Sequence, residues 1–185
     1  MAEDTKKAYF IFDRPHFEVV TATLSDTYTE VTGEFSEHYV DLHPPFCREA
    51  PAFFEKGGLR CLITSGTTGY YPNPSQVCRF PDWHGNYEDL GDPCIGDAAG
   101  TSFYGQFTCV LKMPGKELYI AMPGNRHQEI TKPDRSPKQA GELPKKLKRH
   151  MENTSIARYV WLLVQWEGEK TVIRWYDEWK LKDFL

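Results

Sequence analysis

A turn followed by a short strand-forming segment recurs four times along the 185-residue chain. Each copy begins with Gly, Lys or Asp residues, which favour tight turns, and continues into residues of high β propensity. The copies are DTKKAYFIF at 4–12, EKGGLRCLITS at 55–65, PGKELYIAM at 114–122 and EGEKTVIRW at 167–175. Their starts lie 51 to 59 residues apart, and no segment shows sustained helical periodicity. A period of about 50 residues is typical of a β-propeller with four-stranded blades.

The last three copies are each preceded by another apolar segment, and each pair predicts a β-hairpin. These segments are APAFF, FTCVLKM and YVWLLVQW. The first copy lies close to Met1 and has no such partner, so we expect the chain to begin inside a blade. The sequence therefore predicts an all-β fold, a single partial propeller domain of about three and a half blades. Its expected parts are the remainder of an incomplete blade (1–45), a blade with Glu49 (46–100), a blade with Gln106 and a long loop (101–155), and a last blade (156–185).

Charge and hydropathy indicate what kind of partner the chain binds. The formal net charge is −4, which gives no general electrostatic reason to bind nucleic acid or an anionic membrane. The N-terminal MAEDTKKAYF lacks the apolar core of a signal peptide, and no window approaches the roughly 20 apolar residues of a membrane span. We therefore expect an uncharged partner, neither nucleic acid nor a membrane, and the sequence leaves the compartment open.

The spacing of cysteine and histidine gives no sign of a metal or cofactor. The cysteines lie 14 to 17 residues apart without a C-x-x-C pair, and the six histidines form no H-x-H or H-E-x-x-H pattern. We expect buried thiols, no metal site and no cofactor. The five cysteines are Cys47, Cys61, Cys78, Cys94 and Cys109.

Three polar residues occupy matching positions in the last three repeats. Glu49, Gln106 and Arg158 stand nine, nine and ten residues before the turn glycine of their repeats, just ahead of the first strand of each hairpin. The innermost strands of propeller blades line a central channel, so equivalent positions converge at one mouth of it. A single Glu before a strand is usually a solvated turn residue. The shared register favours a common concave site that holds an acid, an amide and a guanidinium.

Four longer strings resemble glycoside hydrolase family 43, whose members are five-bladed propellers that act on plant polysaccharides and oligosaccharides. The nearest likeness is to the branch that contains exo-β-1,3-galactanases, in which the acid lies in an REAP string and a glutamine replaces the usual aspartate base. The strings are REAPAFF, LITSGTTGYYPNPS, TSFYGQFTCVLKMPGKELYIAM and ARYVWLLVQWEGEKTVIRWYDEWKL.

This resemblance implies an inverting glycosidase with a carbohydrate substrate. Glu49 would protonate the leaving oxygen, which requires a raised pKa, and Gln106 would orient the attacking water. The neighbouring Arg48 would oppose a raised pKa of Glu49 unless its side chain points outward. The branch's Asp-Arg-Trp string reads PGNRHQE here, so Arg126 is retained while His127 stands in place of the tryptophan.

Aromatic residues are the other mark of sugar sites, because flat ring faces pack on the apolar face of a pyranose. Tyr70 and Tyr71 lie in the loop TSGTTGYYPNPS and are candidates for sugar contact, with loop packing as the alternative. The polar segment 123–155 is expected to be a surface loop. Its basic run KKLKRH lacks the interleaved aromatics of a nucleic-acid surface.

Family members also carry acidic residues ahead of the part that this chain resembles. We therefore expect the chain alone to have weak or no activity, with the missing N-terminal blades as a partner. A noncatalytic carbohydrate-binding propeller is the main alternative. A protein-interaction propeller is a third reading, because a fold by itself does not determine function.

Overall fold

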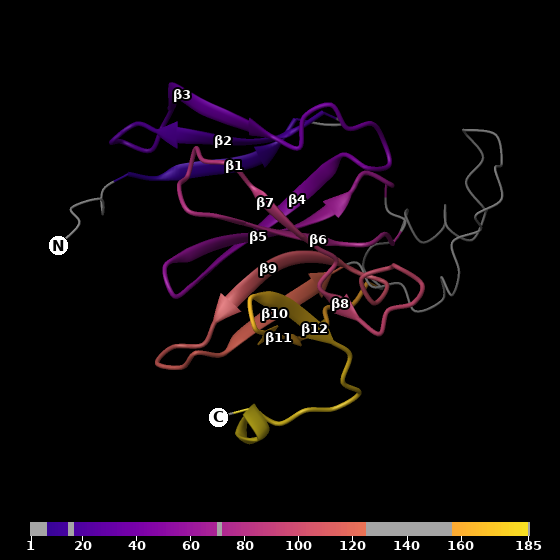
Figure 1. Cartoon of the computed structure of the whole chain (residues 1–185). Coiled ribbons are helices and arrows are strands. Elements are labelled where there is room, and N and C mark those ends of the chain that lie inside the picture. The colour runs from indigo at the N-terminus through magenta and orange to yellow at the C-terminus, as the bar shows by residue number, and fades with distance from the viewer. Residues whose placement is uncertain (1–6, 15–16, 70–71, 125–156, 185) are drawn as a thin grey trace, which may run out of the picture.

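The computed structural model describes residues 7–14, 17–69, 72–124 and 157–184. Within these residues the regular elements are β-strands, with one 3-10 helix, η2 (Leu181–Phe184), near the C-terminus. The prediction of an all-β fold is confirmed. The strands form three sheets that follow one another from the top to the bottom of Figure 1.

Sheet 1 is antiparallel and has one strand fewer than sheet 2. It lies within the segment predicted to be an incomplete blade. Its strands, in spatial order, are β1 (Tyr9–Asp13), β2 (Val19–Leu24) and β3 (Val31–His38).

Sheet 2 is antiparallel and contains the hairpin expected from APAFF and the turn that follows it. Residues 61–66 of its second strand are buried without alternation, because neighbouring sheets cover both faces. In spatial order the strands are β4 (Arg48–Lys56), β5 (Leu59–Gly66), β6 (Gln76–Phe80) and β7 (Glu88–Gly91).

Sheet 3 joins two hairpins that the sequence analysis assigns to separate blades. Residues 119–121 pair with residues 162–164, so the second hairpin extends the sheet of the first. This pairing spans some 40 residues of sequence, and the turn-and-strand repeat holds no information about it. In spatial order the strands are β8 (Cys94–Ile95), β12 (Lys170–Arg174), β11 (Leu162–Glu167), β10 (Tyr119–Gly124) and β9 (Gln106–Lys112).

Two apolar seams hold the sheets together. Phe54 of β4 and Tyr119 of β10 belong to the larger core cluster, which fills the seam between sheets 2 and 3. Between sheets 1 and 2, the ring of Tyr9 stacks on Trp83 at 4.3 Å between centroids, and His38 stacks on Tyr87 at 3.5 Å. Strand β4 contacts both β1 and β9, and each of these three strands is an edge strand of its own sheet.

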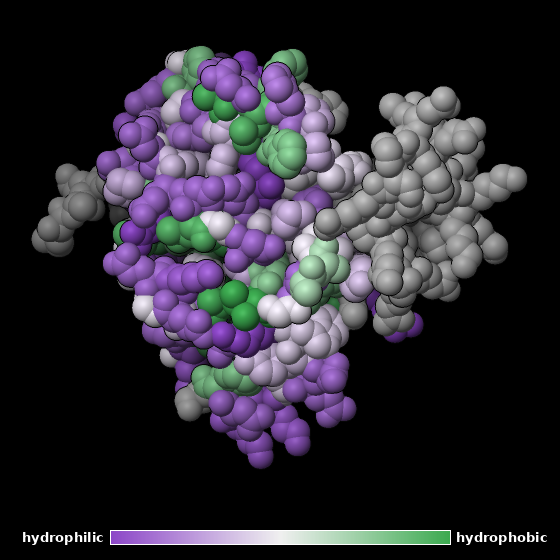
Figure 2. Space-filling model, turned by 45° about the vertical axis from the view of Figure 1, so that its right-hand side comes forward, coloured by the Kyte–Doolittle hydropathy of each residue, from purple (hydrophilic) through white to green (hydrophobic). Residues whose placement is uncertain are grey.

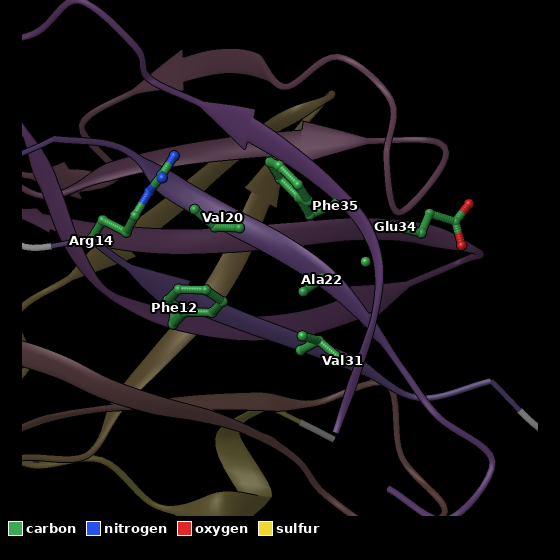
Figure 3. A pocket seen from close by; sticks show the side chains of 8 residues that line it. Phe12, Arg14, Val20, Ala22, Val31, Glu34 and Phe35 are labelled. Atoms are coloured by element: carbon green, nitrogen blue, oxygen red, sulfur yellow. The ribbon is translucent and has the colours of Figure 1, made fainter. Parts of the chain in front are cut away.

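The outward faces of the two end sheets differ. Leu163 and its neighbours on sheet 3 are covered by Trp179 and Phe184 of the C-terminal segment. The outward face of sheet 1, which we name the open face, has apolar side chains that solvent reaches. Phe35 is 59% exposed and Val31 53% exposed, beside a hollow of about 190 Å³ (Figure 3). Figure 2 shows apolar residues among hydrophilic ones near the top of the molecule, where this sheet lies.

The structure shows the state of the cysteines and the arrangement of possible metal ligands and helices. All five cysteines are free, and four of them are buried, as the sequence predicts. Among the described residues, no group of three or more His, Cys, Asp or Glu side chains is placed to hold a metal ion. In the same part of the chain, no helix has the length and apolar character needed to cross a membrane.

Candidate active site

Glu49 is the second residue of β4 and pairs with Ser65 of β5. The ladder slips between Glu49 and Ala52, and Ala50 there has a φ of +52°. A left-handed conformation costs a residue with a side chain roughly 1–2 kcal/mol, so surrounding contacts must hold it. The bulge interrupts the alternation of the strand directly after Glu49 and so sets the direction of its half-buried side chain separately from the apolar residues that follow.

A raised pKa of Glu49 is expected only if the Arg48 side chain points outward into solvent. The structure does not place it there. Its side chain is buried and is held on the side of β5 and the following loop. Nε donates to Thr64 Oγ1 at 3.0 Å, and Nη2 donates to the carbonyl oxygens of Thr64 at 2.7 Å and Pro74 at 3.4 Å. Burial lowers the pKa of the guanidinium, while nearby groups that include Asp89 and Glu49 act in the opposite direction.

Gln106 is the first residue of β9 and pairs with Gly124 of β10. Directly before it, the chain makes a left-handed turn in which Ser102, Phe103 and Tyr104 have φ values of +52°, +56° and +62°. We name residues 101–105 the left-handed turn. Three consecutive residues with side chains in this region are rare, because each has a steric conflict between Cβ and the backbone.

The Asp97 carboxylate holds the left-handed turn together. Its Oδ2 accepts hydrogen bonds from the backbone N–H groups of Thr101 at 2.7 Å and Phe103 at 3.2 Å. The Thr101 hydroxyl donates to Oδ1 at 3.1 Å. Phe103 is buried and packs near Trp175, which anchors the turn in the core. These contacts offset the strain and keep the start of β9 in place.

Glu49 and Gln106 meet across the seam between sheets 2 and 3. The Gln106 amide Nε2 donates to Glu49 Oε1 at 3.2 Å, although the two residues are 57 apart in sequence. Both side chains are half-buried. The structure therefore brings together two of the three residues that the sequence placed at one site. A carboxyl can donate or accept a proton, and the amide keeps a carbonyl oxygen that can accept a hydrogen bond from water.

The direct contact also sets a condition on the chemistry. Inverting glycosidases keep their two groups roughly 6.5–9.5 Å apart, with a sugar and a water between them. Here the amide and the carboxyl touch at 3.2 Å. A scissile bond and a water can therefore lie between Glu49 and Gln106 only if one of the two side chains moves.

The remaining predicted residues are placed differently. Arg158 is exposed, and it precedes β11, the third strand of sheet 3 rather than an inner strand of its own blade. The register argument that equated Arg158 with Glu49 and Gln106 therefore does not describe this topology. Its segment still runs beside the site, because the Val160 N–H donates to the carbonyl oxygen of Pro123, next to the partner of Gln106. Tyr70, Tyr71 and Arg126 lie outside the described residues.

Sequence reasoning missed a group of buried polar residues around this pair. Their hydroxyl and amide groups are hydrogen-bonded to one another and to backbone groups. The sequence signal is the short run PNPS, in which polar residues alternate with proline between two strands. That run is typical of an exposed turn, so nothing in it marks burial. The residues are Ser65, Asn73, Ser75, Thr101 and Ser102.

Comparison with known proteins gives matches among solved structures. No family model matches the sequence, and no curated protein matches it. A family 43 β-1,3-galactosidase solved with galactodeoxynojirimycin is 29% identical, with a TM-score of 0.74 over 98% of this chain and 45% of that one. A second family 43 β-1,3-galactosidase is 25% identical, with a TM-score of 0.77 over 100% of this chain and 34% of that one.

The chain is similar in fold to solved enzymes of glycoside hydrolase family 43. The resemblance inferred from the REAPAFF and TSFYGQ strings is thereby confirmed, and the structural neighbours are propeller enzymes. An exo-β-1,3-galactanase from Clostridium thermocellum, at 20% identity, shares the fold with a TM-score of 0.61 over 94% of this chain and 32% of that one. The chain therefore spans less than half of the length of each of these structures.

Proposed function

We propose that the chain is part of a glycoside hydrolase that cleaves β-1,3-linked galactans. The observation that carries this proposal is the contact between Glu49 and Gln106 at 3.2 Å across two sheets. It joins the acid and the amide on which the family resemblance rests. The names of two similar family 43 structures, both β-1,3-galactosidases, support the choice of substrate.

In the proposed reaction, Glu49 donates its proton to the leaving oxygen as the glycosidic bond breaks. Gln106 accepts a hydrogen bond from a water on the opposite face of the sugar and aligns it with the anomeric carbon. Attack from that face inverts the configuration, and the proton that the water loses passes to the surrounding solvent, from which Glu49 is protonated again. For the sugar to enter, the amide must leave Glu49 and turn toward the water. Arg158, Arg126, Tyr70 and Tyr71 are proposed to bind the sugar around this centre.

We also propose that catalysis needs further blades beyond this chain, in a five-bladed ring to which this chain contributes its three sheets. The solved relatives extend well beyond the matched part, since this chain covers 45% and 34% of them. The exposed apolar residues of the open face fit packing against another blade. Without that blade, water reaches the site, and we expect the chain alone to hydrolyse galactans weakly or not at all.

The test uses this chain fused behind the N-terminal part of the 29%-identical β-1,3-galactosidase. We expect the fusion to hydrolyse β-1,3-galactobiose with inversion. Glu49→Gln should lower turnover of this substrate by about 10²–10⁴-fold and largely spare a dinitrophenyl β-galactoside, whose leaving group needs little protonation. Glu55→Gln, on the exposed far end of the same strand, is the matched control. Equal losses on the two substrates would show that Glu49 is not the acid.

A noncatalytic carbohydrate-binding role is the second candidate. It is favoured by the direct contact of Gln106 with Glu49, which leaves no room for a water between them. In that case the fusion would bind β-1,3-galactobiose without turning it over, and Glu49→Gln would leave both rates at background.

A further inference from the structure

A short segment, residues 73–75, in which Asn73 and Ser75 are buried, links the two halves of the candidate site. On one side, Asn73 is fixed to the end of β5. Its Oδ1 accepts from the Gly66 N–H at 2.7 Å and from the Ser65 hydroxyl at 3.2 Å, and its Nδ2 donates to the Gly66 carbonyl at 3.1 Å. Ser65 is the ladder partner of Glu49. The Asn73 side chain therefore holds the strand end that lies beside the proposed acid.

On the other side, the same segment holds the left-handed turn. The Ser102 hydroxyl donates to the backbone carbonyl of Asn73 at 2.7 Å, and it lies 2.6 Å from the Ser75 hydroxyl. A serine has one hydroxyl proton, so with the Ser102 proton on Asn73, Ser75 must donate to Ser102. Ser102 is 1% exposed and Ser75 4% exposed. The bridge is therefore shielded from water, and losing one member leaves a buried polar group unsatisfied.

The shape of the left-handed turn determines the position of Gln106, the first residue of β9. Gly105 connects them, and a Cβ at this position would lie 2.8 Å from Pro123 Cβ and 3.2 Å from the Gly124 carbonyl oxygen. This close approach of the Gly105 backbone to β10 fixes the position at which β9 begins. The turn is itself strained at three residues, so its shape depends on the hydrogen bonds that hold it.

We infer that Ser102 and Asn73 are positioning residues that set the Gln106 amide against Glu49. A chain of hydrogen bonds runs from Ser65 beside Glu49 through Asn73 to Ser102, and the backbone continues from there to Gln106. For its effect on catalysis the inference rests on the proposed function, but the geometric part can be tested without substrate.

The first test is nuclear magnetic resonance of the ligand-free chain. The side-chain amide peaks of Gln106 are assigned from their loss in Gln106→Ala and then followed in Ser102→Ala. We expect them to shift and broaden, because the strained turn loses the hydrogen bond to Asn73. Thr21→Val is the matched control, since it removes a buried hydroxyl that is bonded to Tyr87 in the other seam. That variant should leave the Gln106 peaks in place.

Ser102→Gly separates the hydroxyl from the backbone strain. Glycine adopts the left-handed region without a Cβ conflict, so the turn keeps its shape although the hydrogen bond is lost. We expect the Gln106 peaks to lie closer to wild type than in Ser102→Ala. If Ser102→Ala does not fold, Ser75→Ala, which removes only the donor to Ser102, is used in its place. Gln106 peaks that stay unchanged in the alanine variant would overturn the inference.

The second test separates this inference from the proposed function. In the active fusion, Ser102→Ala should lower kcat for β-1,3-galactobiose by about 10–100-fold with little change in KM, as expected when a reacting group is misplaced. A purely structural role would instead lower the fraction of folded enzyme and leave kcat per active site unchanged, which contradicts the inference. If the wild-type fusion is inactive but the Gln106 peaks move as expected, the proposed function fails and the positioning role stands.

Discussion

The seam between sheets 2 and 3 and the open face of sheet 1 are both rich in apolar residues. They differ in how far these side chains are buried and in what lies beside them. In the seam, Phe54 and Tyr119 are almost fully buried, and the apolar contacts run up to a polar pair, Glu49 and Gln106. On the open face, Phe35 and Val31 are more than half exposed, and the central strand β2 supplies the buried Val20 and Ala22 behind them (Figure 3).

The difference shows which apolar surface the chain covers by its own packing and which it leaves exposed. The core cluster in the seam contains side chains from both sheets, such as Phe54 and Tyr119, and buried hydrogen bonds fix polar residues beside it. The open face has the same alternation of apolar side chains but no second sheet among the described residues. We therefore expect substitutions in the seam to affect both stability and the site, and substitutions on the open face to affect neither in the isolated chain.

The largest expected effect is that of truncating a phenylalanine in each region. Phe54→Ala should lower the free energy of unfolding by about 3–5 kcal/mol, because it removes a buried ring and leaves a cavity. Phe35→Ala on the open face should change it by no more than about 0.5 kcal/mol. Urea denaturation of the two variants measures both values. Comparable losses would mean that the open face is packed as tightly as the seam.

The next effect is that of adding a methyl group at a glycine in each region. Gly105→Ala places a Cβ 2.8 Å from Pro123 Cβ, and the resulting overpacking should cost about 1–3 kcal/mol. Gly33→Ala on sheet 1 meets nothing within 4 Å, and its cost is the strain of a left-handed residue at φ +90°. Only the first should also move the Gln106 side-chain amide peaks. If both variants leave these peaks unchanged, Gly105 does not control where β9 begins.

The seam between sheets 1 and 2 should make stability depend on pH. Burial, with a contribution from His84, lowers the pKa of His38 from 6.5 to about 4. Between these values the unfolded chain binds a proton that the folded chain does not, so stability is lost as pH falls from about 6.5 to about 4. Carboxylates also titrate in this range, so the comparison is with His38→Gln. Urea midpoints against pH should fall less steeply in this variant, and identical slopes would contradict the assignment.

The smallest effect concerns dye binding to the open face. A hydrophobic dye such as anilinonaphthalene sulfonate should bind the exposed apolar residues, and Phe35→Ser with Val31→Ser should reduce its fluorescence. The melting temperature should change little, because both side chains are exposed. In the fusion with further blades, the wild-type dye signal should also fall. A signal that survives in the fusion would show that no blade covers this face.

The hairpins and the central pair could be predicted from the sequence, because both depend on local signals. Turn glycines next to β-branched and aromatic runs mark the hairpins, and the equal distance from Glu49 and Gln106 to their turns marks the pair. The assignment of hairpins to sheets could not be predicted. β10 pairs with β11 across a segment of more than 30 residues. The sequence pattern of a hairpin is the same whether it forms its own sheet or extends the sheet of another hairpin.

The positioning residues were not predictable for a different reason. Ser102, Phe103 and Tyr104 have no intrinsic preference for the left-handed region, and hydrogen bonds that the turn donates to Asp97 and to the Asn73 carbonyl oxygen hold it there. Arg158 shows that a local spacing alone does not give the position of a residue in a sheet. Its distance from a turn, ten residues, is close to the nine residues of the other two, but its strand is the third of sheet 3, so a similar spacing did not mean an equivalent position.

The most direct test of the account is a titration of the isotope-labelled chain with β-1,3-galactobiose, followed by nuclear magnetic resonance. Binding does not require the catalytic step, so the chain as it stands can be used. We predict saturable shifts of the Gln106 side-chain amide and of the backbone amides around Glu49, with the peaks of Val31 and Phe35 unmoved. Saturable shifts confined to the open face, or a Gln106 amide that stays in place while other peaks saturate, would contradict the claim that the seam holds the sugar site.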